Sequence, residues 1–211
     1  MRKSEIRNPQ SAMEDSAIRN PQSAIEHVVV IGASAGGIEA VMRVLSELPG
    51  DLPAAVIVVQ HLKSDRPTGL PDLLHRKCSL DVRLVENGIP LKMGTVYVAE
   101  PGLHICIEEG CLIQNQGELV NYVRPSADIL FVSAAEAFGK NVIGVVLSGT
   151  GHDGTRGCKE IKARGGITIA QDEKTSRHFG MPNAAIEAGA IDYVLPVYEI
   201  GKKILNIVSL H

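Results

Sequence analysis

Short apolar runs that alternate with amphipathic stretches constrain the fold of this chain more than any other feature. Residues 28–31 form a β-branched run that ends at Gly32, which is typical of a buried strand. Residues 36–48 then carry apolar side chains at helical spacing, and Pro49 and Gly50 end that segment. Because strands and helices that alternate in this way form parallel sheets, we expect an α/β fold. The expected architecture is a doubly wound, mostly parallel sheet with helices on both faces.

The rest of the chain continues this alternation, with one exception in the middle. Further strands are expected at residues 54–59, 82–85, 142–147, 167–170 and 191–195, and further helices near 71–77 and at 127–139, 155–164, 182–188 and 199–208. Three strand-like segments, 95–99, 103–108 and 111–114, are instead separated only by short turns that contain Pro-Gly and Glu-Gly. Since short turns join antiparallel strands, we expect a small antiparallel hairpin or meander inserted there.

The N-terminal residues have a different character. The heptapeptide Ile-Arg-Asn-Pro-Gln-Ser-Ala occurs at residues 6–12 and again at 18–24, and neither copy has an apolar face to bury. We expect residues 1–25 to be a disordered, repeat-containing tail and residues 26–211 to form one folded domain. The tail has no long apolar core of the kind that a signal peptide needs.

Composition excludes several classes of function. The 21 basic and 24 acidic residues nearly balance, so no general electrostatic attraction to nucleic acid or membranes is expected. No apolar run is long enough to span a bilayer. The four cysteines form no Cys-x-x-Cys pair, which favours reduced thiols and a cytoplasmic location.

The loop after the first strand, Gly32-Ala33-Ser34-Ala35-Gly36-Gly37, has three interpretations. A phosphate-binding turn is one, although Ser34 stands where the dinucleotide fingerprint has its second glycine. A nucleophile elbow is another, because Gly-x-Ser-x-Gly matches this loop and the Ala35 N–H would face a developing oxyanion. In the third, Ser34 simply caps the following helix.

Two later strands end in residues that would complete a nucleophilic site. His61 follows the second strand, where it is placed to act as a base for Ser34. Asp153 lies in the glycine-rich loop Gly149-Thr150-Gly151-His152-Asp153-Gly154, after a strand expected to be central. The competing carboxylates are those of Asp65, Glu100, Asp128 and Asp172. The sequence thus favours a Ser34–His61–Asp153 triad, in an order that differs from the α/β-hydrolases.

At this point the motifs resemble a known family. The loops around Ser34, His61 and Asp153 are joined by Arg-Pro-Ser-Ala-Asp at 124–128, Thr-Ile-Ala-Gln-Asp at 168–172 and Gly-Met-Pro at 180–182. Together they resemble the catalytic domain of chemotaxis protein-glutamate methylesterases, the CheB family, from about residue 27 to 205. The resemblance implies a parallel α/β domain that removes methyl esters from glutamates on the cytoplasmic helices of chemotaxis receptors. Many members also deamidate receptor glutamines.

Residue roles follow from the same resemblance. Ser34 would be the nucleophile, His61 the general base and then acid, and Asp153 the orienting carboxylate. Ala35, Thr150 and Met181 would contribute to the oxyanion or substrate site, although Met181 also suits core packing. No metal or organic cofactor is implied. Ala35 and Thr150 depart from the threonine and methionine that family members often have there.

The resemblance also bears on partners and on alternative functions. The usual receiver domain is not expected, so residues 26–211 are expected to act as a free-standing catalytic domain. A receptor methyltransferase or a separate response regulator is a possible partner. The basic residues Lys63, Arg66, Arg76 and Lys77 either meet acidic receptor helices or form a solvated face. The main alternative is a non-catalytic module that binds receptors or a methyltransferase, and a nucleotide-binding domain is a third reading.

Overall fold

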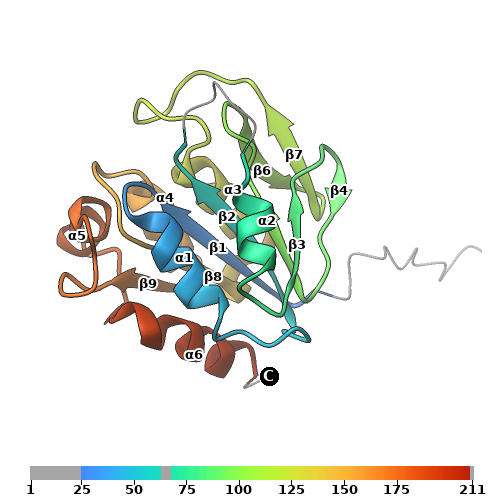
Figure 1. Ribbon diagram of the computed structural model, residues 1–211. Helices are drawn as coiled ribbons and strands as arrows, with labels where there is room; N and C mark the ends of the chain where they lie inside the picture. The colour runs from blue at the N-terminus through green and yellow to red at the C-terminus, as the bar shows by residue number, and fades with distance from the viewer. Residues whose placement is uncertain (1–24, 63–67, 210–211) are drawn as a thin grey trace, which may run out of the picture.

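A seven-stranded parallel sheet forms the centre of the computed structural model, which describes residues 25–62 and 68–209 (Figure 1). Its strands stand in the order β10-β9-β8-β1-β2-β5-β3. In chain order their bounds are β1 His27–Ala33, β2 Ala54–Gln60, β3 Asp81–Leu84, β5 Thr95–Val98, β8 Val142–Val146, β9 Ile167–Gln171 and β10 Tyr193–Leu195. The helices are α1 Gly37–Leu45, α2 Leu70–His75, α3 Ala127–Phe138, α4 Thr155–Ala163, α5 Gly180–Glu187 and α6 Val197–Val208, with a 3₁₀ turn at Gly139–Asn141.

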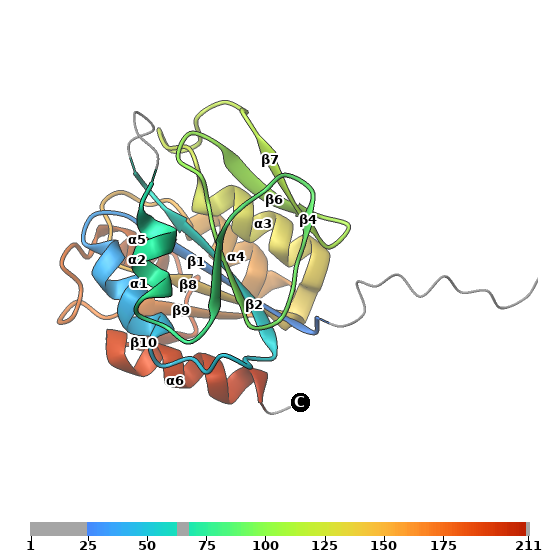
Figure 2. The same cartoon turned by 45° about the vertical axis from the view of Figure 1, so that its right-hand side comes forward.

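Helices cover both faces of this sheet, as Figures 1 and 2 show. Successive side chains of a strand point to opposite faces, so β1 contributes to two separate cores. Val28 and Val30 pack with residues of α3, α4 and α5, whereas Val29 and Ile31 pack with residues of α1, α2 and α6. The doubly wound α/β fold expected from the sequence is therefore confirmed.

The middle of the chain forms a second, antiparallel sheet of three strands in the order β4-β7-β6. These strands are β4 Ile89–Pro90, β6 His104–Glu108 and β7 Cys111–Asn115. The small sheet lies beside α3, where the Ile107 N–H donates to Ser133 Oγ at 3.0 Å. An antiparallel insertion was expected here, and the hairpin of β6 and β7 confirms it.

One strand of the expected meander belongs elsewhere. β5 pairs in parallel with β2 and with β3, inside the main sheet, so its assignment to the antiparallel insertion is wrong. All four of its residues are buried, as suits a strand covered on both faces. The turn at Pro101 and Gly102 carries the chain out of the main sheet into the small one, instead of reversing it within one sheet.

The strand order creates a switch point beside β1. The chain runs from β1 to β2 on one side, and returns later to place β8 on the other side. The loops after β1, β2 and β8 therefore meet at one edge, which is where open α/β sheets bind ligands. No helix in the described part of the chain is long and apolar enough to cross a membrane. Residues 1–24, and with them nearly all of the expected tail, lie outside the described residues.

Candidate active site

Ser34 follows β1 directly, in the loop that leads into α1. Its N–H donates to the Ser148 carbonyl at 3.0 Å, and its own carbonyl accepts from Gly37 N–H at 2.8 Å. The N-cap of α1 is Gly36, whose φ of 73° suits glycine, and no side chain caps the helix. The Ser34 hydroxyl is therefore not the cap of α1, and it remains available for chemistry.

Gly149 allows the loop after β8 to approach Ser34 closely. A Cβ atom at this glycine would lie 2.8 Å from Ser34 Cβ and 2.3 Å from Met181 Sδ. Both distances are shorter than any ordinary carbon contact. Any side chain at position 149 would therefore displace Ser34, Met181 or both.

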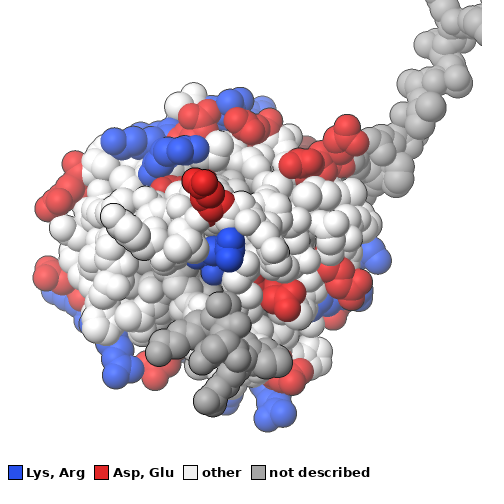
Figure 3. All heavy atoms as spheres, turned by 90° about the horizontal axis from the view of Figure 1, so that it is seen from above, with Lys and Arg blue, Asp and Glu red and all other residues white. Residues whose placement is uncertain are grey.

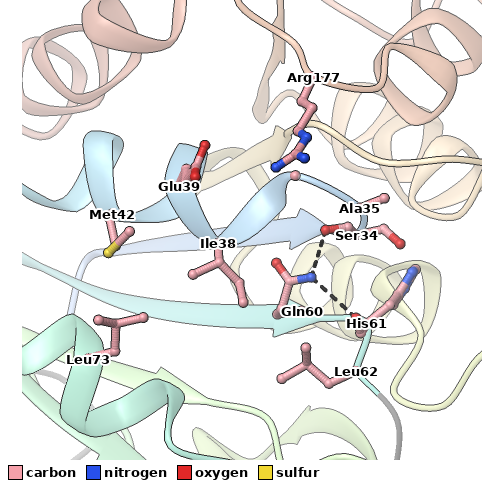
Figure 4. A pocket seen from close by; sticks show the side chains of 11 residues that line it. Ser34, Ala35, Ile38, Glu39, Met42, Gln60, His61, Leu62, Leu73 and Arg177 are labelled. Atoms are coloured by element: carbon pink, nitrogen blue, oxygen red, sulfur yellow. Dashed lines mark hydrogen bonds between the residues drawn. The ribbon is translucent and has the colours of Figure 1, made fainter.

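His61 and Asp153 are in direct contact. His61 Nε2 donates to Asp153 Oδ2 at 2.9 Å, while the backbone N–H of His61 donates to the Ala33 carbonyl at 2.9 Å. The imidazole is 11% exposed and the carboxylate 3% exposed. Because Asp153 occupies Nε2, the nitrogen left for a hydroxyl proton is Nδ1. In Figure 4 the His61 ring points toward the Ser34 side chain.

The Asp153 carboxylate also closes the N-terminus of α3. Its Oδ1 accepts from Ser126 Oγ at 2.6 Å and its Oδ2 accepts from Ala127 N–H at 2.6 Å. The helix that follows Asp153 in sequence, α4, is capped by Gly154 instead. Burial would raise the pKa of Asp153, but the hydrogen bonds from His61, Ser126 and Ala127 outweigh it and lower the pKa to about 2. The carboxylate is thus ionised throughout the physiological range.

Asn121 links two buried carboxylates, and sequence reasoning missed it. Its Nδ2 donates to Asp153 Oδ1 at 3.0 Å and to Asp128 Oδ2 at 2.8 Å. Asp128 also accepts from Gly157 N–H at 2.8 Å. Burial raises the pKa of Asp128, and the neighbouring charge of Asp153 adds to that effect. Asn121 has a φ of 54°, and the preference of asparagine for such turn positions is the one signal that could have found it.

Gln60, the last residue of β2, ties the serine loop to the histidine. Its Nε2 donates to the Ser34 carbonyl at 2.8 Å and to the His61 carbonyl at 3.2 Å. The side chain is only 4% exposed. Sequence reasoning assigned Gln60 no role in the site. The structure shows instead that it braces the backbone on both sides of the site.

A pocket of about 630 Å³ opens beside Ser34 and His61. Its walls are mostly apolar side chains from α1, the end of β2 and α2, namely Ile38, Met42, Leu62 and Leu73. Arg177 and Glu39 add one charge of each sign, and Figure 4 shows the Arg177 guanidinium extending over the pocket. Because its lining is mostly apolar, the pocket can hold an uncharged group next to the serine. On the face of the molecule seen in Figure 3, charges of both signs are interspersed.

Comparison with known proteins identifies the family. The family model for CheB methylesterase matches residues 29–204. The chain belongs to the CheB methylesterase family. The crystal structure of the Thermotoga maritima CheB methylesterase catalytic domain matches this fold with a TM-score of 0.81 and 36% sequence identity. That match covers 86% of this chain and 98% of the Thermotoga chain.

Curated relatives carry matching names. A protein-glutamate methylesterase/protein-glutamine glutaminase 2 from Anaeromyxobacter dehalogenans is 47% identical over 173 residues, which are 82% of this chain and 51% of that protein. The protein-glutamate methylesterase FrzG of Myxococcus xanthus is 42% identical over 184 residues, 87% of this chain and 55% of FrzG. The chain spans about half the length of these two CheB relatives.

The competing carboxylates that the structure describes do not contact His61. Asp172 accepts hydrogen bonds from the N–H and hydroxyl of Thr175, and Asp128 binds Asn121 and Gly157. Within residues 25–62 and 68–209, Asp153 is the carboxylate that contacts His61. Asp65 lies outside the described residues, as do Lys63 and Arg66 of the expected basic stretch.

The three predicted substrate-site residues lie in different environments. Ala35 lines the pocket, and its N–H donates to no acceptor among the described residues. Thr150 is exposed beside Gly149. Met181 is fully buried, and its N–H donates to the Gly149 carbonyl at 2.9 Å, so it packs beneath the loop. Roles for these residues in substrate binding stay predictions.

Among the described residues, metal-binding side chains do not gather at the CheB site. The described residues contain no group of three or more His, Cys, Asp or Glu side chains that could hold a metal ion. His152 and His178 are both exposed. The ionisable groups that do converge are His61 and the carboxylate it contacts.

Proposed function

We propose that this domain is a protein-glutamate methylesterase that hydrolyses γ-glutamyl methyl esters on methyl-accepting chemotaxis receptors. One observation carries the proposal: an imidazole held at 2.9 Å by a buried carboxylate shares a pocket with Ser34. The names of both CheB relatives support the ester substrate, and the Anaeromyxobacter name also supports a second activity, the deamidation of protein glutamines.

The proposed reaction begins with a proton transfer. His61 Nδ1 takes the Ser34 proton as Oγ attacks the ester carbonyl, and a tetrahedral oxyanion forms. The free N–H of Ala35 is the first candidate to stabilise that oxyanion. Asp153, ionised above about pH 2, holds the imidazole and stabilises its charged form.

Collapse of the intermediate breaks the bond to the alkoxy group. Methanol leaves with the proton that His61 returns, and a glutamyl ester of Ser34 remains. Water then attacks this ester with His61 again as base, which releases the glutamate and restores Ser34. With a glutamine substrate ammonia leaves in place of methanol, and the second half of the reaction is unchanged.

The proposed receptor substrate also indicates a cellular location and binding partners for this protein. The cytoplasmic helices of chemotaxis receptors are its proposed partners, so the proposed location is the cytoplasm. A receptor methyltransferase and a separate response regulator are further proposed partners.

The alternative is a non-catalytic module that binds the same receptors. A binder needs neither a buried carboxylate against His61 nor a free serine hydroxyl beside it. The hydrogen bonds that hold Asp153 with a pKa of about 2 favour catalysis over binding alone.

Methanol release from a methylated receptor cytoplasmic fragment tests the proposal. We expect release by the wild type, and a loss of roughly 10⁴–10⁶ in kcat for Ser34→Ala or His61→Ala. Ser46→Ala is the matched control, because its hydroxyl binds only the Arg43 carbonyl near the end of α1. No release by folded wild-type protein from several receptors would favour the binding module. Full activity in Ser34→Ala would refute the nucleophile.

A further inference from the structure

A two-residue hairpin lies directly beside the proposed triad. Val120 and Val123 exchange backbone hydrogen bonds of 3.2 and 3.0 Å, and the turn between them consists of Asn121 and Tyr122. Both turn residues have positive φ, 54° and 65°. Turns with two such residues normally carry glycine at the second position, which here is a tyrosine.

The two turn residues differ in what stabilises them. Asn121 tolerates the left-handed region, and its amide is fixed by Asp153 and Asp128. Tyr122 is a bulky residue in a strained conformation, and its side chain is 94% exposed. At that exposure, packing against the described part of the chain does not compensate for its strain. Backbone strain of this kind is retained mainly at functional sites.

The position of the hairpin relates Tyr122 to the reaction. Asn121 contacts the same carboxylate as His61, and consecutive Cα atoms are about 3.8 Å apart. Tyr122 is therefore one residue away from a side chain that contacts the proposed triad, and it is exposed to solvent there. Leu119, which is 58% exposed, precedes the hairpin and adds apolar surface.

We propose that residues 119–123 form a substrate-recognition hairpin, in which Tyr122 contacts the polypeptide that carries the methylated glutamate. This inference rests on the proposed methylesterase function and identifies a residue that determines its specificity. A tyrosine offers a flat apolar face and a polar hydroxyl at low entropic cost, which suits a protein surface. Asn121 fixes this contact at a constant distance from Asp153.

The recognition hairpin has a kinetic signature that depends on substrate size. A polypeptide long enough to reach Tyr122 gains the contact, whereas a single-residue ester gains nothing from it. For a methylated receptor fragment, Tyr122→Ala should raise KM by about ten-fold with kcat little changed. For N-acetyl-glutamate γ-methyl ester, the same variant should match the wild type in methanol release.

A second variant separates recognition from folding. Glycine suits a φ of 65°, so Tyr122→Gly should raise the thermal midpoint while it raises KM as much as Tyr122→Ala does. A merely structural tyrosine would not combine higher stability with weaker recognition. Tyr198→Ala is the control, because Tyr198 is a half-exposed tyrosine of α6, which covers the opposite face of the main sheet from α3 (Figure 1).

Three results would overturn the recognition hairpin. The first is an unchanged KM for the receptor fragment in both Tyr122 variants, with methanol release by the wild type intact, which leaves the methylesterase standing. The second is an equal fall in kcat on both substrates, which would mean that the hairpin acts through Asp153 and not through substrate contact. The third is no methanol release by the wild type, which removes the proposed function together with this inference.

Discussion

Replacement of Gly149 by alanine should disturb the site and the core together. The position has no positive φ, so alanine is tolerated by the backbone and only its Cβ atom matters. That atom would lie 2.8 Å from Ser34 Cβ and 2.3 Å from Met181 Sδ. Met181 is fully buried and has little room to move away.

The expected size of the effect follows from these distances. Carbon atoms in contact are separated by about 3.5 Å or more, so Ser34 Cβ must shift by about 0.7 Å. A misplacement of about 1 Å at reacting atoms lowers the rate by about 10²-fold. Overpacking of a core typically costs about 1–3 kcal/mol, and each kcal/mol lowers Tm by roughly 2–4 °C in a domain of this size.

Methanol release and thermal unfolding of Gly149→Ala measure the two effects. Gly69→Ala is the matched control, because its Cβ would meet no described residue within 4 Å and its φ is −86°. We expect the control to keep the wild-type Tm and kcat. A Gly149→Ala variant with normal Tm and kcat would refute the close packing of Gly149 against Ser34. A lowered Tm with normal kcat would show that Met181 alone yields.

Three further predictions concern the buried carboxylate, the core and the thiols. The pKa of Asp153 lies at about 2, below its usual 3.8, so its ionisation stabilises the fold above about pH 4. That contribution to the free energy of unfolding, of order 2 kcal/mol, should be lost as the pH falls from 4 to 2. Urea unfolding at several pH values measures it, and Asp153→Asn should lose less stability over the same range. Phe131→Ala should lower the free energy of unfolding by about 3–5 kcal/mol in the same assay, because the ring is fully buried. Ellman's reagent should modify Cys111 in the native protein but Cys158 only after unfolding, because burial raises the pKa of the Cys158 thiol and excludes the reagent. Rapid native labelling of Cys158 would contradict its burial.

The strand-end residues were predictable because parallel strands place their carboxyl ends at one edge. Local patterns located the strands before Ser34, His61 and Asp153, and the switch-point rule brought them together. The contact between His61 and Asp153 agrees with that reasoning. The alternative of a Ser34 helix cap disappears, because Gly36 begins α1 without a side-chain cap.

The remaining parts of the site depend on contacts that no local pattern encodes. Asn121 and Ser126 bind Asp153 across 32 and 27 residues of sequence. The turn at Asn121 lacks glycine, so the usual hairpin signal was absent. β5 was misplaced because a short turn follows it, whereas its complete burial between β2 and β3 depends on the whole sheet.

One carboxylate connects the chemistry of the site to the packing of the core. Asp153 holds His61 and also closes the N-terminus of α3, so the position of the imidazole depends on the position of that helix. α3 in turn packs closely against β1 and α4. A Cβ on Gly32 of β1 would lie 2.7 Å from Ala127 Cβ, and a Cβ on Gly157 of α4 would overlap the Phe131 side chain. Enlarging Gly32 would push α3 away from β1, and enlarging Gly157 would push it away from α4. The geometry of the site is therefore set by close helix–sheet packing, and a core substitution remote from Ser34 should lower activity along with stability.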